Sequence, residues 1–385
     1  MKYQLGAGLG VLVSAALGVA AAIGAQGVFL DEALDYEAER LRTYIEERAV
    51  REAGPFQALI DAQHAAQAQF VRYWSHLDDT THDQLFDTFF LEHPSGARRS
   101  RPDHFDGVLE HGGELYTYGM GAFLGETEPD AARRRALVAA YLTVRAAGPA
   151  YRSWFDNLYF NDDRNNLVIF APDREDRLMY YREQAPADFS FNHLRFVRLT
   201  QPVNNPLGET RCTNLAVRLD REERRALHVS CHTPVRVNGL HLGAFGTSID
   251  VRAYLMRALD APPQGAQNLI VTRDGELVSH PALFEQDIIT DADVEAVRAQ
   301  IDVSEVTQAV INVGQPMGVT IAPDGSSLIG FARLEAPGWY FITQQSLPRA
   351  HRDSWVKAGL LGLVVVLILA GGVLSLLRRV ITQRD

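Results

Sequence analysis

The residues of this chain that could do chemistry are its histidines and cysteines, and the histidine spacing argues against catalysis. His228 and His232 lie four positions apart in a β-rich run. On a strand they would share a face but sit about 13 Å apart, too far to bind one metal ion. His104 and His111 flank a loop, and residues 31 to 357 contain no nucleophile elbow, phosphate-binding loop, zinc-binding His-Glu pair or tandem cysteine pair. We therefore predict a non-catalytic protein without a metal ion or cofactor.

The length and net charge of the chain limit the number of domains and the kind of partner that we expect. A chain of 385 residues is long for one domain, so we expect two or three folded units. The formal net charge is -11, and the sequence has no cluster of Lys and Arg of the kind that binds a phosphate backbone. We therefore exclude a nucleic-acid partner.

Two apolar segments lie at the ends of the chain. Ala358 to Leu377 is a run of twenty residues without a charge. A helix of about 20 apolar residues crosses a hydrocarbon core of about 30 Å, so this run predicts a transmembrane helix. The first segment, Leu5 to Ile23, is interpreted as an uncleaved anchor because Ile23 suits a cleavage site poorly. A cleaved signal peptide is the alternative.

Charges at the first segment set the orientation. Lys2 precedes it, and Asp31, Glu32 and three further acids follow it. The positive-inside tendency then leaves the amino terminus in the cytoplasm. The second segment has basic residues on both sides, so it gives less information about the orientation. We expect both termini in the cytoplasm and residues 31 to 357 outside, in an oxidising compartment.

The cysteines Cys212 and Cys231 would meet in that compartment. A hairpin with a four-residue loop at 220 to 223 sets them directly opposite each other. A register one residue away would instead align apolar residues of the two strands, namely Leu215, Val217, Leu219, Leu227 and Val229. The two registers are expected to exclude one another. We expect a disulfide, and two free thiols are the alternative.

Helical spacing predicts a stalk over residues 31 to 77. Apolar residues recur every three to four positions, and Gly54-Pro55 is expected to divide the stalk into two helices. This stripe consists of Leu34, Ala38, Leu41, Ile45, Phe56, Leu59, Ile60, Phe70 and Trp74. It packs either on the chain's own domain alone or also on a second subunit, and we expect a homodimer through the stalk helices.

Residues 78 to 260 mix helical and strand patterns. Helices are expected over Thr81 to Phe90 and within Pro129 to Phe160, and strands over Leu167 to Phe170 and Leu178 to Tyr181. The clearest strands lie within residues 227 to 251. They are joined by Asn238-Gly239, a pair that favours a tight hairpin turn because both positions accept positive φ. A helix over Val251 to Leu259 follows.

A linker at residues 261 to 265 introduces a smaller β-rich unit with one inserted helix, Asp291 to Ile301. Its turns are expected at Asp274-Gly275, Asp324-Gly325 and Pro337-Gly338. Its strand candidates are Asn268 to Thr272, Glu276 to His280, Gly318 to Ile321, Ser327 to Leu334 and Trp339 to Gln344.

These observations divide the chain into six parts. They are a cytoplasmic start and first transmembrane helix (1–30), stalk helices (31–77), a membrane-distal module (78–260), a membrane-proximal module (261–350), a second transmembrane helix (351–377) and a cytoplasmic tail (378–385).

The order of these elements resembles the double Cache sensor domains of bacterial transmembrane receptors. HTPVRVNGLHLGAFGTSIDVRAYL looks like the closing hairpin and helix of a distal module. NLIVTRDGELVSHPAL and GWYFITQQSLP look like the opening and closing strands of a proximal one. The resemblance covers roughly residues 31 to 350. It implies an α+β fold of two tandem PAS-like modules with antiparallel sheets, a long first helix and a flanking transmembrane helix at each end.

The resemblance also implies a role and a location. Such a chain would lie in the bacterial inner membrane with its large domain in the periplasm. It would bind a small molecule and signal to a cytoplasmic effector outside this chain, of the histidine kinase, diguanylate cyclase or chemoreceptor type. The alternative is a non-catalytic periplasmic binding or assembly platform that recognises a protein partner and has no output domain.

The ligand would lie over the sheet of the distal module. The positions that the resemblance implies are Phe170, Arg174, Arg177, Tyr180, Tyr181, Ser230, His232 and Ser248. An arginine beside stacked tyrosines could hold a carboxylate while the rings bury the rest of the ligand. Alternatively, Arg174 and Arg177 pair with neighbouring acids on the surface.

The identity of the ligand stays open. Amino-acid-binding members of the family typically carry an Arg-x-Trp-Tyr type motif after the first strands. Arg152-Ser153-Trp154-Phe155 imitates its first half but precedes the strand at Leu167. We therefore do not predict an amino acid.

Overall fold

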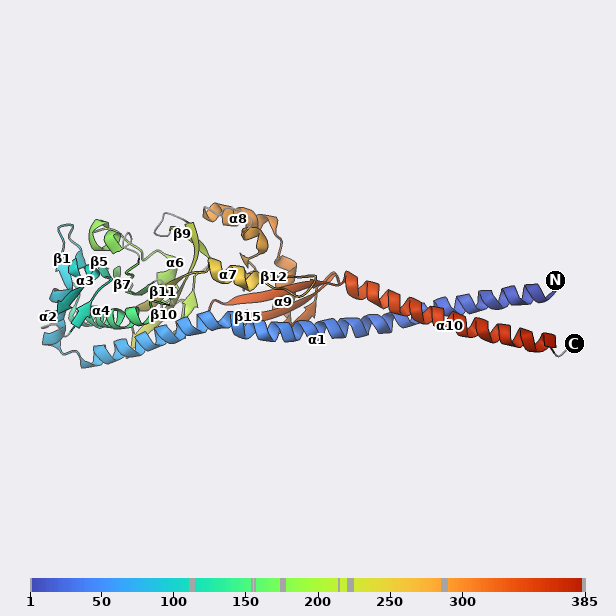
Figure 1. Ribbon diagram of the computed structural model, residues 1–385. Coiled ribbons are helices and arrows are strands. Elements are labelled where there is room, and N and C mark those ends of the chain that lie inside the picture. Colours follow the sequence, from blue (N-terminus) through green and yellow to red (C-terminus); the bar gives the residue numbers. More distant parts are fainter. Residues whose placement is uncertain are drawn as a thin grey trace.

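The computed structural model describes residues 2–110, 115–153, 155, 157–173, 178–213, 215–219, 225–284 and 290–382. The molecule is elongated, with a head of helices and strands at one end and a shaft of two helices at the other (Figure 1). Both chain termini lie at the free end of the shaft. The head contains two large antiparallel sheets, one close to the shaft and one far from it, which we call the proximal and distal sheets.

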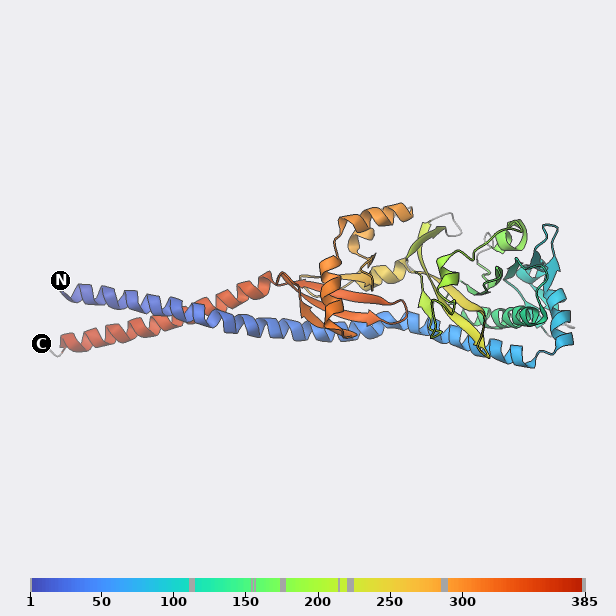
Figure 2. The ribbon, with the colours of Figure 1, turned by 180° about the vertical axis from the view of Figure 1, so that it is seen from behind.

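The first helix, α1 (Lys2–His76), runs the whole length of the molecule and lies along both sheets (Figure 2). It continues through Pro55, so the expected interruption at Gly54-Pro55 is wrong. A proline inside a helix costs about 3 kcal/mol. Burying a large apolar side chain contributes about 1.5–3 kcal/mol, and Ile45, Phe56 and Leu59 around the proline are all buried. Packing on both sides of Pro55 therefore outweighs its local cost.

The apolar stripe of α1 packs on the chain's own sheets. Leu41 and Ile45 contact the proximal sheet so closely that a Cβ on Gly330 would lie 2.7 Å from Ile45. Farther along, the ring of Phe70 stacks on Phe160 of the distal sheet, with ring centres 5.6 Å apart. A second subunit would therefore have to contact the opposite, exposed face of α1.

The distal sheet has nine strands in the order β1-β2-β5-β7-β6-β11-β10-β8, and β9 also pairs with β10. A separate hairpin of β3 (Val108–Glu110) and β4 (Leu115–Thr117) lies beside it. The nine strands are β1 (Phe90–Glu92), β2 (Arg98–Ser100), β5 (Met120–Leu124), β6 (Leu158–Asn161), β7 (Asn166–Phe170), β8 (Arg211–Cys212), β9 (Ala216–Leu219), β10 (Arg225–Val237) and β11 (Leu240–Asp250). The predicted Asn238-Gly239 turn joins β10 to β11, with φ of 50° and 80°.

Six short or medium helices lie around the distal sheet in the part of the chain that the structure describes. They are α2 (Asp79–Phe89), α3 (Asp103–Asp106), α4 (Ala131–Tyr151), the π-helix η2 (Tyr180–Gln184), α6 (Arg195–Arg198) and α7 (Arg252–Leu259). The helix expected to extend to Phe160 ends at Tyr151, and Leu158 begins a strand instead. The strand expected over Leu178 to Tyr181 is wrong, because this segment is helical. Strand β7 already pairs with β5 and β6, so the chain after it has no free neighbour there.

The proximal sheet has five strands in the order β13-β12-β16-β15-β14. They are β12 (Ala266–Thr272), β13 (Leu277–Ser279), β14 (Met317–Ile321), β15 (Ser327–Leu334) and β16 (Trp339–Ser346), and all five match expected strands. Gly275, Gly325 and Gly338 have positive φ at the three expected turns. The 3-10 helix η3 (Pro281–Leu283) and α8 (Asp291–Gln300), which Thr290 caps, follow β13. Helix α9 (Ser304–Val313) was not expected.

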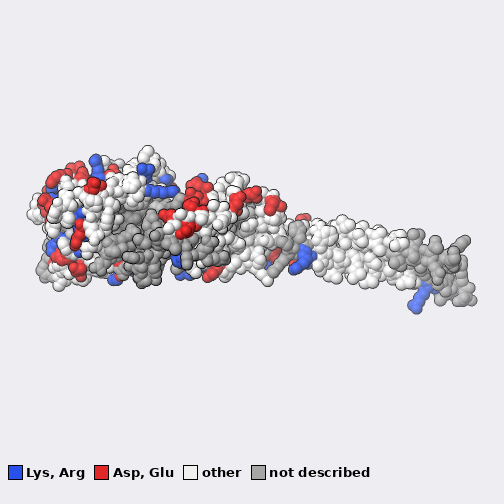
Figure 3. Space-filling view, turned by 90° about the horizontal axis from the view of Figure 1, so that it is seen from above, with Lys and Arg blue, Asp and Glu red and all other residues white. Residues whose placement is uncertain are grey.

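The last helix, α10 (Pro348–Thr382), packs against α1 to form the shaft. Two helices among the described residues, Leu12–His76 and Arg352–Leu376, are long and apolar enough to cross a membrane, with mean hydropathies of 1.8 and 2.6 over their most apolar 18 residues. Figure 3 shows an almost uncharged shaft beside a head that carries many charged side chains.

Both strand registers considered for the cysteines occur in the structure. Cys212 pairs with Cys231 across β8 and β10, and a disulfide bond joins their sulfur atoms. In β9, Val217 pairs with Leu227, which is the other register. The expectation that the registers exclude one another is therefore wrong. The chain breaks its pairing between β8 and β9 and so shifts by one residue.

Candidate ligand-binding layer of the distal module

The two faces of the distal sheet are covered in different ways. The inner face packs on α1 and α4 through side chains such as Phe160, Val168 and Phe245. The outer face carries Phe123, Tyr159, Leu167 and Ile169. It is covered by the chain after β7, residues 178–213, which we call the covering segment. Before β8 at its end, the covering segment contains only short helices, so it packs on the sheet mainly through side chains.

The structure places most of the expected ligand-site residues in this outer layer. Tyr180 and Tyr181 belong to the covering segment and contact the ring of Phe189. Ser230 pairs with Ser248 across β10 and β11, and their hydroxyl oxygens lie 3.0 Å apart. Arg174 and Arg177 lie outside the described residues.

Phe170 does not belong to this layer, which corrects the expectation. Successive side chains of a strand point to opposite faces, and Leu167 and Ile169 occupy the outer face of β7. Phe170 therefore points inward. It packs against Gly148 of α4, where a Cβ would lie 2.4 Å from its ring, and against Tyr118.

His232 is the most deeply buried polar residue of the predicted set, with no exposed surface. Its ring stacks on Phe196 with centres 5.2 Å apart, and its Nε2 lies 3.3 Å from the hydroxyl of Tyr159. Its Nδ1 has no hydrogen-bond partner within the described part of the chain. Burial lowers the pKa of His232 to about 3, so the imidazole is neutral at physiological pH.

Two arginines of this layer were missed at the sequence level. Arg99 of β2 is 2% exposed and donates hydrogen bonds to the carbonyls of Tyr181 and Ala185. Its guanidinium lies 5.2 Å from the ring centre of Phe123. Arg182 is 6% exposed and donates to the carbonyl of Pro102 at 3.1 Å. Arg99 falls in a stretch rich in Pro, Gly and charge that is typical of an exposed loop, so no sequence signal indicated its burial.

Neither arginine makes an ion pair with a carboxylate among the residues that the structure describes. Burial lowers the pKa of Arg99. The Nε atoms of Arg99 and Arg182 also lack hydrogen-bond partners within the described ranges. A buried guanidinium is normally paired, because removing an unpaired charge from water is costly. The layer therefore has two positive groups that an anionic partner would stabilise.

The covering segment is held to the sheet at a few points. Asn165, in the turn between β6 and β7, has a φ of 67°. Its side chain donates to the carbonyl of Phe189 and accepts from the backbone N–H of Phe191 at 2.9 Å. Gly121 leaves room for Leu178, whose Cδ2 would lie 2.7 Å from an added Cβ. This arrangement of rings, imidazole and guanidinium groups could enclose a small anion.

A second buried polar cluster lies beneath the β3–β4 hairpin. His104 contacts the hydroxyl of Tyr141 through Nδ1, and its Nε2 lies 2.5 Å from Glu110. Arg145 lies 3.6 Å from the other oxygen of Glu110. Burial lowers the pKa of His104 and raises that of Tyr141. The cluster ties α3, β3 and α4 together and has its charges matched internally.

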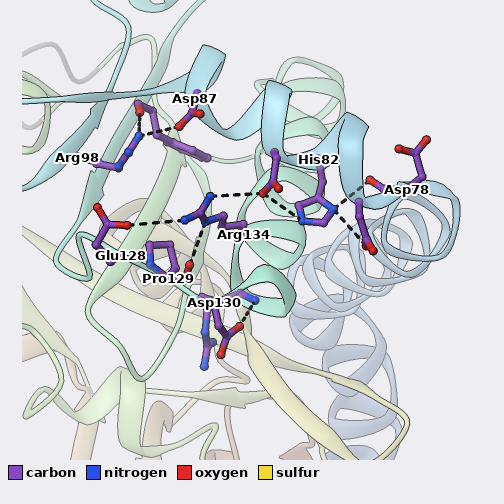
Figure 4. A network of polar contacts seen from close by, with 12 residues as sticks. Asp78, His82, Asp87, Arg98, Glu128, Pro129, Asp130 and Arg134 are labelled. Atoms are coloured by element: carbon purple, nitrogen blue, oxygen red, sulfur yellow. Dashed lines mark hydrogen bonds and ion pairs between the residues drawn. The ribbon is translucent and has the colours of Figure 1, made fainter.

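A third cluster, at the tip of the head, is also internally paired (Figure 4). Arg134 of α4 lies 3.5 Å from Asp83 and 3.7 Å from Glu128, and it donates to the carbonyl of Pro129. Arg98 of β2 pairs with Asp87 at 3.0 Å. These contacts fasten α2 to the sheet and to α4, so we interpret the cluster as structural.

Arg152, which imitates an amino-acid-binding motif, is paired on the surface. Its Nε and Nη2 donate to the two oxygens of Asp173 at 3.0 and 2.7 Å. Trp154 lies outside the described residues. The described contacts of Arg152 are therefore those of a surface ion pair, and the ligand identity stays open.

The fold is similar to solved sensor domains. The chain matches the ligand-binding domain of the Pseudomonas fluorescens chemoreceptor CtaA in complex with L-serine at a TM-score of 0.37 and 13% identity, over 80% of this chain and 98% of that one. It matches the ligand-binding domain of the Pseudomonas aeruginosa amino acid chemoreceptor PctC in complex with GABA at 0.31 and 12%, over 54% and 80%. A domain of a sensory box/GGDEF family protein from Vibrio parahaemolyticus matches at 0.37 and 13%, over 56% and 81%.

The structure of the chain itself confirms the predicted α+β class, with antiparallel sheets and a long first helix. No protein-family profile matches the chain. A chitooligosaccharide deacetylase from Serratia marcescens is 32% identical over 91 residues, which are 23% of this chain. The chain spans only about a third of that relative's length, 34%.

Proposed function

We propose that this chain is a membrane-anchored extracytoplasmic sensor that binds a small carboxylate-bearing molecule in the outer layer of its distal module. The observation that carries the proposal is the burial of Arg99 beneath the covering segment with no carboxylate within ion-pair distance in the described residues, where Glu183 acts on it only from farther away. A carboxylate can accept two parallel hydrogen bonds from a guanidinium, and such a bond is stronger than one to a neutral carbonyl. The surrounding rings would bury the apolar part of the ligand.

Binding would reach the membrane through the chain's own helices. The ligand would replace the bonds that Arg99 makes to the covering segment, and so shift the distal module between two packings. Helix α1 packs on both sheets and on α10, so such a shift is passed to the shaft. We place the chain in a bacterial inner membrane with its head in the periplasm, and its signal goes to a cytoplasmic effector outside this chain.

Thermal unfolding of the full chain in lipid nanodiscs tests the proposal. We expect at least one compound from a library of small carboxylates, with amino acids and GABA included, to raise Tm by about 2–4 °C at saturation. The Arg99→Lys and His232→Phe variants should lose this shift. The matched control Arg333→Lys, on the surface of the proximal sheet, should keep it.

The result that contradicts direct sensing is equally clear. If no compound raises Tm of the intact chain, or if the shift survives in both variants, the outer layer does not bind the ligand. A protein partner would then be the better candidate for the signal.

A further inference from the structure

A cavity of about 520 Å³ lies where the head joins the shaft, far from the distal module. Helix α1 contributes Glu32, Glu37 and Arg40 to its lining, and α10 contributes Asp353 and Lys357. Figure 3 shows charged side chains at this junction, beside the uncharged surface of the shaft. The volume is within the range of small-molecule sites, about 300–1,000 Å³.

The charges around this cavity are only partly matched. Glu37 accepts hydrogen bonds from Gln345 at 2.8 Å and from Arg40 at 3.3 Å. Glu32 and Lys357 line the same cavity, yet neither makes an ion pair among the described residues. Asp353 lies 3.7 Å from Arg352 in an exposed pair that contributes little. An ammonium group and two carboxylates therefore face the cavity without strong partners.

The cavity lies at the height expected for lipid headgroups. Lys357 directly precedes Ala358, the first residue of the uncharged run. On the other helix, Glu32 follows the apolar residues Val28 and Leu30. Trp355 follows the lining residue Asp353 by two positions and is 53% exposed, and tryptophan is enriched at the membrane–water interface. A lipid headgroup would thus meet the cavity at a high local concentration.

We propose that this cavity binds the headgroup of a zwitterionic phospholipid that carries a primary ammonium. The phosphate would lie at Lys357, and the ammonium would donate hydrogen bonds to Glu32 and Asp353. A quaternary ammonium has no N–H to donate to these carboxylates. The surplus of acids around the cavity disfavours an anionic headgroup. The inference rests on the proposed membrane placement of the two apolar helices and not on a ligand in the distal module.

Because both α1 and α10 line the cavity, a bound headgroup would hold the two helices together at the membrane surface. The lipid would therefore stabilise one arrangement of the shaft.

The test compares the full chain in nanodiscs of phosphatidylcholine alone, phosphatidylcholine with phosphatidylethanolamine, and phosphatidylcholine with phosphatidylglycerol. We expect phosphatidylethanolamine alone to raise Tm. Titration of that lipid in detergent should give an affinity about tenfold weaker for Lys357→Gln and for Glu32→Gln. Asp31→Asn is the matched control, since Asp31 does not line the cavity, and this variant should bind as the unaltered chain does.

Several results would overturn the proposal. Equal Tm in all three bilayers, or a preference for phosphatidylglycerol, would exclude recognition of the ammonium. If soluble phosphoethanolamine raises Tm in detergent as much as phosphatidylethanolamine does, the cavity binds a free zwitterion and not a lipid. If Glu32→Gln does not fold, Asp353→Asn provides the same readout from the other helix. None of these outcomes depends on the carboxylate library used for the distal module.

Discussion

At the scale of single residues, the outer layer combines groups that are seldom buried together. Arg99, Arg182 and His232 are each at least nine-tenths buried, and polar atoms of all three lack partners in the described chain. Their main contacts are aromatic rings, such as Phe105 beneath Arg182 at 4.7 Å. Buried polar groups without partners cost stability, which a core selected for packing alone would avoid. We therefore interpret them as groups kept for binding.

His232 leads to a prediction about acid stability. Burial lowers its pKa in the folded chain from 6.5 to about 3. Between these pH values the unfolded chain binds a proton that the folded chain does not, so stability falls as the pH drops from 6.5 towards 3. The loss is of the order of 4 kcal/mol. We expect His232→Phe to remove this part of the pH dependence, measured by thermal unfolding at pH 7, 5 and 3.5.

The exposed His64 of α1 provides the control for this measurement. His64→Phe should leave the pH dependence of the unaltered chain in place. If His232→Phe and the unaltered chain lose stability in parallel as the pH falls, the imidazole is not held neutral by burial.

At the scale of elements, α1 is hydrogen-bonded to the end of α7 and to the linker that follows it. Arg48 donates to the carbonyls of Ala258 and Asp260 and is paired with the buried carboxylate of Glu52 at 3.0 Å. Tyr44 donates to the carbonyl of Ala261, which has a φ of 52°. A non-glycine residue with positive φ needs its surroundings to hold it there. These bonds make α1 and the linker one mechanical unit.

Removal of Arg48 should therefore be costly. We expect Arg48→Met to destabilise the chain by about 3 kcal/mol, because Glu52 loses its buried partner and keeps only the exposed Arg51. The double variant Arg48→Met with Glu52→Leu should recover part of this loss. Unfolding by denaturant measures both.

Arg42, on the same helix, is the matched control, since its side chain and that of its partner Glu39 are both exposed. Arg42→Met should cost less than about 1 kcal/mol. An Arg48→Met variant as stable as Arg42→Met would show that the linker does not depend on this contact.

At the scale of the whole molecule, the shaft is a crossing of two helices at small residues. A Cβ on Gly18 of α1 would lie 2.3 Å from Val366 and 2.7 Å from the carbonyl oxygen of Gly362. Ser14 and Ala358 are buried beside this crossing. Small residues let membrane helices approach closely, and the packing replaces the hydrophobic drive that is missing in lipid. The crossing therefore sets how a movement of one helix reaches the other.

A larger side chain at the crossing should separate the helices. We expect Gly18→Val to increase the distance between spin labels placed at Val19 and Leu361. It should also lower Tm, because overpacking costs about 1–3 kcal/mol of stability. Gly24→Val is the matched control, because nothing lies within 4 Å of a Cβ at Gly24. Unchanged spin-label distances in Gly18→Val would contradict the crossing.

Short-range chemistry explains which features could be predicted from the sequence. The turns at Asn238-Gly239, Gly275 and Gly325 depend on residues that accept positive φ, and the structure has them there. The uncharged run from Ala358 needs only its own length to predict a spanning helix. Each of these features is encoded by a few adjacent residues.

The tertiary structure alone decided the remainder, because the causes lie far apart in the chain. Pro55 stays within α1 since both sheets pack against that helix. Tyr180 lies in a helical turn because β7 is already paired with β5 and β6 and cannot pair with a further strand. The candidate site changed for the same reason, as strand alternation turned Phe170 inward and the covering segment buried Arg99. Burial is a property of the assembled layers, and no local pattern encodes it.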